Sequence, residues 1–283
     1  MADYHIGLPA WAYAGWNNTY FTTSPSALES YASVFNTVEG NTTFYHIPDE
    51  KTVRSWLHSV TGHDFKFCFK FPKSVTHLAK PDFHDLDLFI RRIEPLKDHT
   101  GPFLLQFPAT VGPDEIDRIE SILKNIPGDF RTAIEVRHED FFTQPELLEP
   151  TISRYRTGRV IMDTRSVFNG DRNHPEVLAA LHQKPDLPVP GQVYNGLLMI
   201  RLLLHPDLVS NDKYIDQWAT RTAQALNADC QCYMMIHCPN NQHCPALALQ
   251  FHNRLLSKLK HPGSSVELPA LASWPVPQQQ HLI

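Results

Sequence analysis

The chain has 283 residues, a formal net charge of −5 at pH 7 and an apolar fraction of 42%. This length suits one large domain or two small ones, and the composition is typical of a globular protein with a sizeable core. The acidic balance disfavours a broad nucleic-acid surface, which needs clustered lysines and arginines. No apolar run approaches the ~20 residues that cross a bilayer, and the N-terminus lacks the pattern of a secretory signal. We therefore expect a soluble, cytoplasmic protein with no membrane partner.

In the first half of the chain, short apolar strands alternate with amphipathic helices. Residues 5–11 predict a weak first strand, because Gly7 and Pro9 interrupt it, and Ser24 is a good N-cap for the helix that follows. The stretch 35–48, FNTVEGNTTFYHIP, predicts the second strand and its loop. A strict alternation over residues 65–77 predicts a strand with phenylalanines on one face and lysines on the other.

The second half of the chain continues the same alternation. The predicted strands are residues 101–108, 131–141, 159–163, 197–206 and 230–241. The predicted helices include residues 82–97, 144–156 and 212–227. Residues 182–196 are proline-rich and long for an internal connection, which marks them as a candidate lid.

Eight strands that alternate with helical segments favour a parallel sheet with helices outside it. Over about 260 residues, this count fits a single (β/α)8 TIM-like barrel with an irregular first strand better than an open sheet. The chain has no GxGxxG or GxxxxGK[ST] motif, which disfavours dinucleotide and P-loop binding. We expect one barrel domain over residues 1–261 and a proline-rich tail over residues 262–283.

Seven segments together resemble the YecE-like family, known as the domain of unknown function 72. They are WAYAGW, FNTVEGNTTFYHIP, FKFPKSVTH, GPFLLQFP, the EVRH of the fifth strand, the aspartate of the sixth strand and the NN after the last. The resemblance covers most of the chain and implies a TIM-like barrel, in agreement with the strand count. It implies no established activity.

In such a barrel the working residues lie at the carboxyl ends of the strands. Glu135 and Asp163 fall at the ends of adjacent predicted strands, and paired carboxylates divide acid and base work when their environments separate their pKa values. Lys70 and Arg137 suit an anion clamp, and Lys70 is also a candidate for imine chemistry if it loses its proton. The alternative for all four residues is a structural network of ion pairs inside the barrel.

Other polar residues at the same end of the barrel would bind the substrate. Glu39 and Asn41 would orient it, and Asn240 and Asn241 would help form a phosphate site before the last helix. For Asn240 and Asn241 the alternative is a helix cap. The remaining predicted substrate-binding residues are Tyr45, His77, Gln106, Arg137 and Arg201, and Trp11 and Trp16 are candidates for stacking.

Two sets of residues raise the question of a metal. His237, Cys238, His243 and Cys244 match no common zinc spacing. Glu39, His77, Glu135, Asp163 and His205 would serve a phosphodiesterase that uses bound cations. We predict no metal ligand and no cofactor, although a divalent metal stays open as an alternative.

The resulting functional hypothesis is an enzyme, a hydrolase or a lyase, that acts on a small anionic substrate of phosphate or sugar type. Glu135, Asp163 and Lys70 would be its catalytic residues. One alternative is a metal-dependent phosphodiesterase that processes nucleic acid, a partner that the net charge disfavours. Another is a non-enzymatic protein that binds a ligand in the same pocket.

Overall fold

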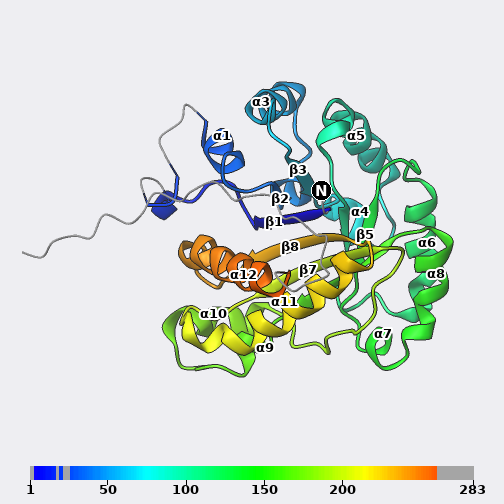
Figure 1. Ribbon diagram of the computed structural model, residues 1–283. Coiled ribbons are helices and arrows are strands. Elements are labelled where there is room, and N and C mark those ends of the chain that lie inside the picture. The colour runs from blue at the N-terminus through cyan, green and yellow to red at the C-terminus, as the bar shows by residue number, and fades with distance from the viewer. Residues whose placement is uncertain (1–2, 17–18, 22–25, 260–283) are drawn as a thin grey trace, which may run out of the picture.

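The computed structural model describes residues 3–16, 19–21 and 26–259. Eight parallel strands in these ranges form one sheet, which curls into a nearly closed barrel with the helices around it (Figure 1). The strands are β1 (Tyr4–Leu8), β2 (Thr37–Gly40), β3 (Lys66–Phe69), β4 (Phe103–Gln106), β5 (Thr132–Glu135), β6 (Gly158–Asp163), β7 (Leu197–Leu203) and β8 (Gln231–His237). The TIM-like (β/α)8 barrel predicted from the sequence is confirmed.

The helices fill the connections between strands. The α-helices are α1 (Ala27–Ala32), α2 (Thr42–Tyr45), α3 (Glu50–Val60), α4 (Lys73–Thr76), α5 (Phe83–Ile93), α6 (Ile116–Lys124), α7 (Asp140–Thr143), α8 (Glu149–Arg154), α9 (Arg165–Phe168), α10 (Pro175–Gln183), α11 (Asp212–Asn227) and α12 (Cys244–Leu259). Short 3-10 turns are η1 (Ala14–Trp16), η2 (Glu94–His99), η3 (Pro113–Glu115), η4 (Pro145–Leu147), η5 (Val209–Asn211) and η6 (Asn241–His243). None of these helices, within the described part of the chain, is long and apolar enough to cross a membrane.

The sheet order is β3-β2-β1-β8-β7-β6-β5-β4, so β3 and β4 lie at the closing seam. Single bridges cross this seam from Phe67 to Thr100 and from Lys70 to Leu104. The Phe71 amide also donates to the Leu104 carbonyl oxygen at 3.0 Å. The seam therefore places the end of β3 directly beside β4.

Strand alternation divides the barrel into an inner and an outer face. One apolar cluster fills the inside: Cys68, Leu104, Ala133, Val160, Leu197, Met199, Tyr233 and Met235. Phe67 and Phe69 belong to the larger cluster between strands and helices, where their rings stack at 5.0 Å. The next inward position on most strands carries a polar side chain, and this position is where the site begins.

Several element boundaries differ from the sequence predictions. Helix α1 begins at Ala27, with Ser26 as its N-cap, and the predicted N-cap Ser24 lies outside the described residues. Strand β5 ends at Glu135 rather than 141, so Arg137 lies on the following loop. Helix α10 was not predicted from the sequence. The predicted tail, residues 262–283, lies outside the described part of the chain.

Candidate active site at the carboxyl ends of the strands

A polar cavity of about 600 Å³ opens at the carboxyl ends of the strands. This is the end of a TIM barrel at which active sites form. Its walls come from the strand ends, from α2 and α4, and from α10 with the residue that follows it. The principal polar residues that line it are Asn41, Tyr45, Lys70, Lys73, His77, Gln106, Arg137, Glu176, Lys184, Arg201, His237 and Asn241.

Arg201 of β7 is the centre of a buried ion network at the base of the cavity. Its Nε and Nη2 donate to the Glu39 carboxylate, both at 2.8 Å, and its Nη1 donates to Glu135 Oε2 at 2.6 Å. Arg137 donates from Nε and Nη2 to Glu135 Oε1, at 2.9 and 2.8 Å. Both carboxylates are therefore held by arginines, which is the condition for keeping buried charges in a folded chain.

Glu39 has two further partners. Asn41 Nδ2 donates to Glu39 Oε1 at 2.8 Å, and His237 Nε2 lies 3.0 Å from Glu39 Oε2. Burial raises the pKa of Glu39, but Arg201 and His237 outweigh it and hold that pKa well below its usual range. Burial lowers the pKa of His237 despite the nearby carboxylate, so its ring is neutral at neutral pH.

Glu135 is also ionised. Burial opposes its charge, but Arg201 and Arg137 bring the pKa of Glu135 down to about 2. A carboxyl group with this pKa holds no proton near neutral pH and is a poor general acid. In the structure its carboxylate accepts hydrogen bonds from two arginine side chains, those of Arg137 and Arg201.

Lys70 differs from the other cations of the site because no carboxylate pairs with it. The side chain is 8% exposed and lines the cavity. Its Nζ lies 4.2 Å from the centre of the Phe44 ring and makes no hydrogen bond or ion pair with a residue that the structure describes. Burial, reinforced by Arg201, lowers the pKa of Lys70 to about 8.

Two neutral polar side chains lie near Lys70. Burial, together with the charge of Lys70, lowers the pKa of His77 to about 4, and Thr76 Oγ1 lies 2.9 Å from His77 Nδ1. Gln106 is 5% exposed, and its Oε1 is buried without a hydrogen-bond partner among the described residues. Buried polar atoms are nearly always hydrogen-bonded, so an orphan acceptor in a cavity wall indicates a place for a ligand donor.

Only the start of the candidate lid, residues 182–196, reaches the cavity, through Gln183 and Lys184. Lys184, the first residue after α10, lines the cavity, and burial with the nearby Arg201 lowers its pKa. The segment is tied down by Thr164 Oγ1, which donates to the Pro185 carbonyl at 2.9 Å, and by Arg221, which donates to the Pro190 carbonyl at 2.9 Å. Three lining residues, Lys73, Lys184 and Glu176, were not predicted from the sequence, because neither α10 nor the rim of the cavity was expected there.

The structure does not bring Glu135 and Asp163, the predicted acid and base, together at the cavity. Asp163 follows Met162, whose sulfur lies 3.8 Å from Arg201 Nη1 inside the barrel, so Asp163 faces outward. Its carboxylate accepts from Trp218 Nε1 at 2.7 Å and from Arg165 Nη2 at 2.7 Å. The Asp163 carboxylate therefore joins β6 to α11 rather than facing the cavity.

Other predicted site residues also have structural partners. His205 lies past the end of β7, where its Nδ1 accepts from the Asp207 amide at 3.0 Å. Asn240 caps η6 through Gln242 N and donates to Glu176 Oε1 at 2.6 Å, so the helix-cap alternative holds for it. Trp16, one of the two candidates for stacking, is fully buried. Tyr45 is 80% exposed at the cavity mouth.

The two metal hypotheses gain no geometric support. Within the described ranges, no group of three or more His, Cys, Asp or Glu side chains is placed to hold a metal ion. His237 contacts Glu39, whereas His243 Nε2 lies 3.3 Å from Glu176 Oε2. The set of five residues is divided as well, because His77 is the one member of it that lines the cavity.

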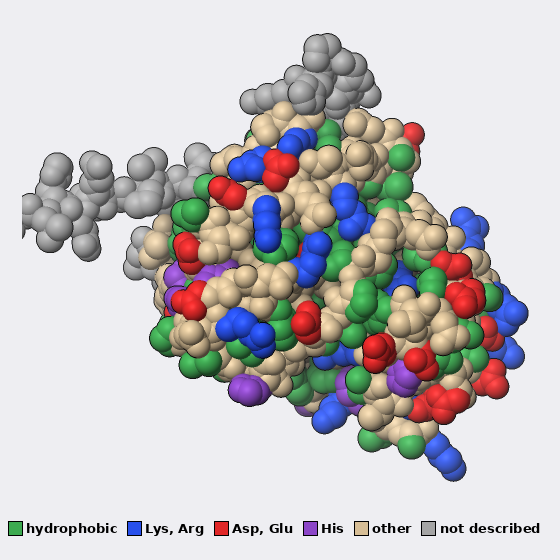
Figure 2. Space-filling view, turned by 90° about the horizontal axis from the view of Figure 1, so that it is seen from below, with side chains coloured by type: hydrophobic (Ala, Val, Ile, Leu, Met, Phe, Trp, Pro, Cys, Tyr) green, Lys and Arg blue, Asp and Glu red, His purple; other side chains and the backbone are tan. Residues whose placement is uncertain are grey.

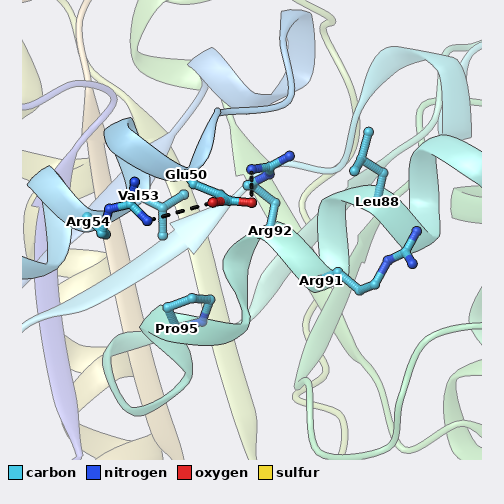
Figure 3. Close-up of a pocket in the computed structure, with 7 residues that line it drawn as sticks. All are labelled: Glu50, Val53, Arg54, Leu88, Arg91, Arg92 and Pro95. Atoms are coloured by element: carbon cyan, nitrogen blue, oxygen red, sulfur yellow. Dashed lines mark ion pairs between the residues drawn. The ribbon is translucent and has the colours of Figure 1, made fainter.

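Two other hollows are weaker candidates. One of about 350 Å³ lies on the outer surface between α3 and α5, where Glu50 pairs with Arg54 and Arg92 (Figure 3). Its third arginine, Arg91, pairs with Asp87 at 2.6 Å. Another, of about 610 Å³, includes Arg131 and Thr132 at the amino end of β5, the end that serves stability in these barrels. On the face shown in Figure 2, acidic and basic side chains are interspersed, without a broad basic patch.

Fold and site together define a parallel α/β barrel with a cation-rich polar cavity at its carboxyl end. A family model described as "Protein of unknown function DUF72" matches residues 5–272. The chain belongs to this family. It is 35% identical to the UPF0759 protein YecE of Escherichia coli K12 over 277 residues, which are 95% of this chain and 98% of that protein, and 34% identical to the O157:H7 counterpart over the same shares.

Solved structures agree on the fold. A DUF72 family protein from Enterococcus faecalis V583 matches with a TM-score of 0.66 at 20% identity, over 90% of this chain and 98% of that one. A DUF72 family protein from Thermotoga maritima MSB8 matches with a TM-score of 0.64 at 19% identity, over 89% and 99%. At identities of 20% and 19%, the similarity shows a shared barrel fold and gives no information about activity.

Proposed function

We propose that this protein is an enzyme that binds a small anionic substrate in the cavity at the carboxyl end of the barrel. The observation that carries the proposal is the buried ammonium group of Lys70, which faces the cavity without a carboxylate partner. An uncompensated buried cation costs free energy, and a bound anion would relieve that cost. The substrate group would be a phosphate or a carboxylate.

The balance of charge around the cavity supports an anion. Five cationic side chains line it, namely Lys70, Lys73, Arg137, Lys184 and Arg201, against one carboxylate in the lining, that of Glu176. Below the cavity lining, the carboxylates of Glu39 and Glu135 offset two of these positive charges. The excess of positive charge in a partly enclosed site attracts anions and raises their local concentration.

The arginines differ in what they offer a ligand. All three guanidinium nitrogens of Arg201 are engaged with Glu39 and Glu135, so Arg201 acts on a ligand through its charge. Arg137 uses Nε and Nη2 for Glu135, and its Nη1 makes no bond to any residue that the structure describes. The direct contacts to the anion would come from Arg137 Nη1, Lys70 and Lys184.

Proton transfer falls to Lys70 in this proposal, because Glu135 stays ionised and Asp163 points away. With a pKa of about 8, Lys70 exchanges its proton close to physiological pH, which is what acid–base catalysis requires. The neutral ring of His77 would relay a proton or donate a hydrogen bond. A hydrolase or a lyase reaction is compatible with these groups.

The proposal is tested by titrating inorganic phosphate, and then a panel of small phosphorylated and carboxylated compounds, into the protein while heat of binding is measured. We expect Lys70→Met to weaken phosphate binding at least tenfold, while Lys51→Met, an exposed lysine on α3, leaves it unchanged. Compounds that bind are then incubated with the protein and followed by NMR for turnover.

Four outcomes separate the hypotheses. Saturable phosphate binding that Lys70→Met removes, together with turnover of a bound compound, supports the enzyme. Binding without turnover across the panel would make the protein a ligand-binding protein, and no binding of any anion would overturn the proposal. Turnover that requires an added divalent metal would favour the metal-dependent phosphodiesterase instead.

A further inference from the structure

The surroundings of Lys70 suit an amine that reacts rather than one that only carries charge. Imine chemistry at Lys70 requires that the lysine can lose its proton, which a paired carboxylate would oppose. The two nearby carboxylates, Glu39 and Glu135, are both engaged by arginines. Among the residues that the structure describes, the Lys70 amine contacts the face of the Phe44 ring, whose centre lies 4.2 Å from Nζ, and pairs with no carboxylate.

Opposing effects decide the charge of this amine. The Phe44 ring favours the ammonium form, as do the charges of Glu135 and Glu39. Burial and the charge of Arg201 oppose it and prevail, so that the pKa of Lys70 falls to about 8. A substantial fraction of Lys70 is therefore a neutral amine at mildly alkaline pH, and a neutral amine is the nucleophilic form.

The residues around the amine match what an addition to a carbonyl group needs. Lys70 is paired across the seam with Leu104, and Gln106 lies two residues further along β4 on the same inner face, so the orphan amide and the amine line the same cavity. Gln106 Oε1 is placed to accept from a hydroxyl group. Arg137 and Lys184 would hold an acidic group elsewhere on the same ligand.

We propose that Lys70 forms a reversible imine with the carbonyl group of a small anionic aldehyde or ketone. This inference rests on the proposed function, since the anion clamp is what would bring the carbonyl to the amine. The cavity of about 600 Å³ limits the ligand to the size of an oxo acid or an open-chain sugar phosphate.

The step balances without an oxidant or a reductant. The neutral amine of Lys70 adds to the carbonyl carbon, and a proton moves from nitrogen to the carbonyl oxygen to give a carbinolamine. The carbinolamine hydroxyl then leaves as water after it takes a proton, and a C=N bond forms to nitrogen. His77 is placed to carry these protons, and Gln106 to hold the hydroxyl, and water reverses the reaction.

The experiment uses glyoxylate, a small aldehyde with a carboxylate, together with sodium cyanoborohydride at pH 8. The reagent reduces an imine to a stable secondary amine, which adds the mass of the probe less one oxygen atom. Adducts are located by peptide mass mapping in wild type, Lys70→Arg and Lys51→Arg. Lys70→Arg keeps the positive charge but forms no imine, and Lys51 is an exposed lysine on α3 that does not line the cavity.

We expect modification to concentrate at Lys70. At neutral pH its neutral fraction exceeds that of an exposed lysine by a factor on the order of 100, from a pKa of about 8 against 10.5. Inorganic phosphate should slow the labelling of Lys70 by occupying the clamp. The Lys51→Arg variant should be labelled at Lys70 like wild type, and Lys70→Arg should lose this adduct.

The outcomes distinguish this inference from the function on which it rests. Phosphate binding to wild type and Lys70→Arg, with no adduct at Lys70, would overturn the imine and leave the anion site standing. Labelling at Lys184 in place of Lys70 would overturn it as well. Labelling of Lys70 that phosphate does not slow, and that neutral propionaldehyde matches, would instead overturn the anion clamp.

Discussion

Glu39 of β2 and Arg201 of β7 form a buried two-bonded ion pair across the barrel, although 162 residues separate them in the chain. Bidentate pairing of this kind is among the strongest charge-assisted contacts in proteins. Arg201 extends it to Glu135 on β5, so one guanidinium joins three strands. The base of the cavity is consequently rigid, and the groups that can respond to a ligand lie above it.

The network predicts a specific loss of stability in acid. The pKa of Glu135 is depressed from 4.5 to about 2, so its stabilising contribution is present above about pH 4.5 and is lost as the pH falls toward 2. The loss from this residue alone is about 3 kcal/mol. Unfolding by denaturant at a series of pH values should show it, and Glu135→Gln should flatten the slope between pH 4.5 and 2. An unchanged slope in the variant would contradict the role assigned to Glu135.

Lys70 should lower stability at neutral pH. Its pKa is depressed in the folded state, about 8 against 10.5, so the cost of the buried charge is fully present below pH 8 and is relieved as the pH rises toward 10.5. Lys70→Met should therefore raise the free energy of unfolding at pH 7 by about 1–3 kcal/mol. The gain should shrink by pH 10, and Lys51→Met should change stability by less than about 0.5 kcal/mol. A destabilised Lys70→Met protein at pH 7 would show that the ammonium has a stabilising partner.

Sequence reasoning located the barrel because hydrophobic periodicity is a local property. It also placed Lys70 correctly, since the alternation over FKFCFK sets which residues share a face. The cluster Cys68, Leu104 and Ala133 confirms the inward face of three successive strands. Lys70, Gln106 and Glu135 are each two residues beyond this layer, as the strand period requires.

The failures arise where a strand is apolar on both faces. In RVIMD the residues Val160, Ile161 and Met162 are all apolar, so the sequence does not reveal that Met162, rather than Asp163, faces inward. His205 does not point into the site because β7 ends at Leu203, two residues before it. The strand alternation that would put His205 on the same face as Arg201 therefore stops short of it. His237 was weighed only as a zinc ligand, although Tyr233, Met235 and His237 share the spacing of one face.

Asp163 should matter for stability and not for ligand binding. Asp163→Asn keeps the size of the side chain but turns an acceptor oxygen into a donor group next to Trp218 Nε1 or Arg165. A buried unpaired donor costs about 1–3 kcal/mol, so the melting temperature should fall. Phosphate affinity, measured well below that temperature, should match wild type. A loss of phosphate binding in folded Asp163→Asn protein would restore a role for this carboxylate in the site.

Gln106 should contribute to ligand selectivity and little to folding. Its Oε1 is buried without a partner, so Gln106→Leu removes an unsatisfied acceptor and should leave stability unchanged or raise it by about 1 kcal/mol. If the amide accepts from a ligand hydroxyl, the variant should lose the preference of wild type for glycerol phosphate over inorganic phosphate, a difference of roughly tenfold. Gln183→Leu, an exposed residue of α10 at the same rim, is the matched control and should keep that preference. If wild type binds the two phosphates with equal affinity, the Gln106 amide accepts no hydrogen bond from a ligand hydroxyl.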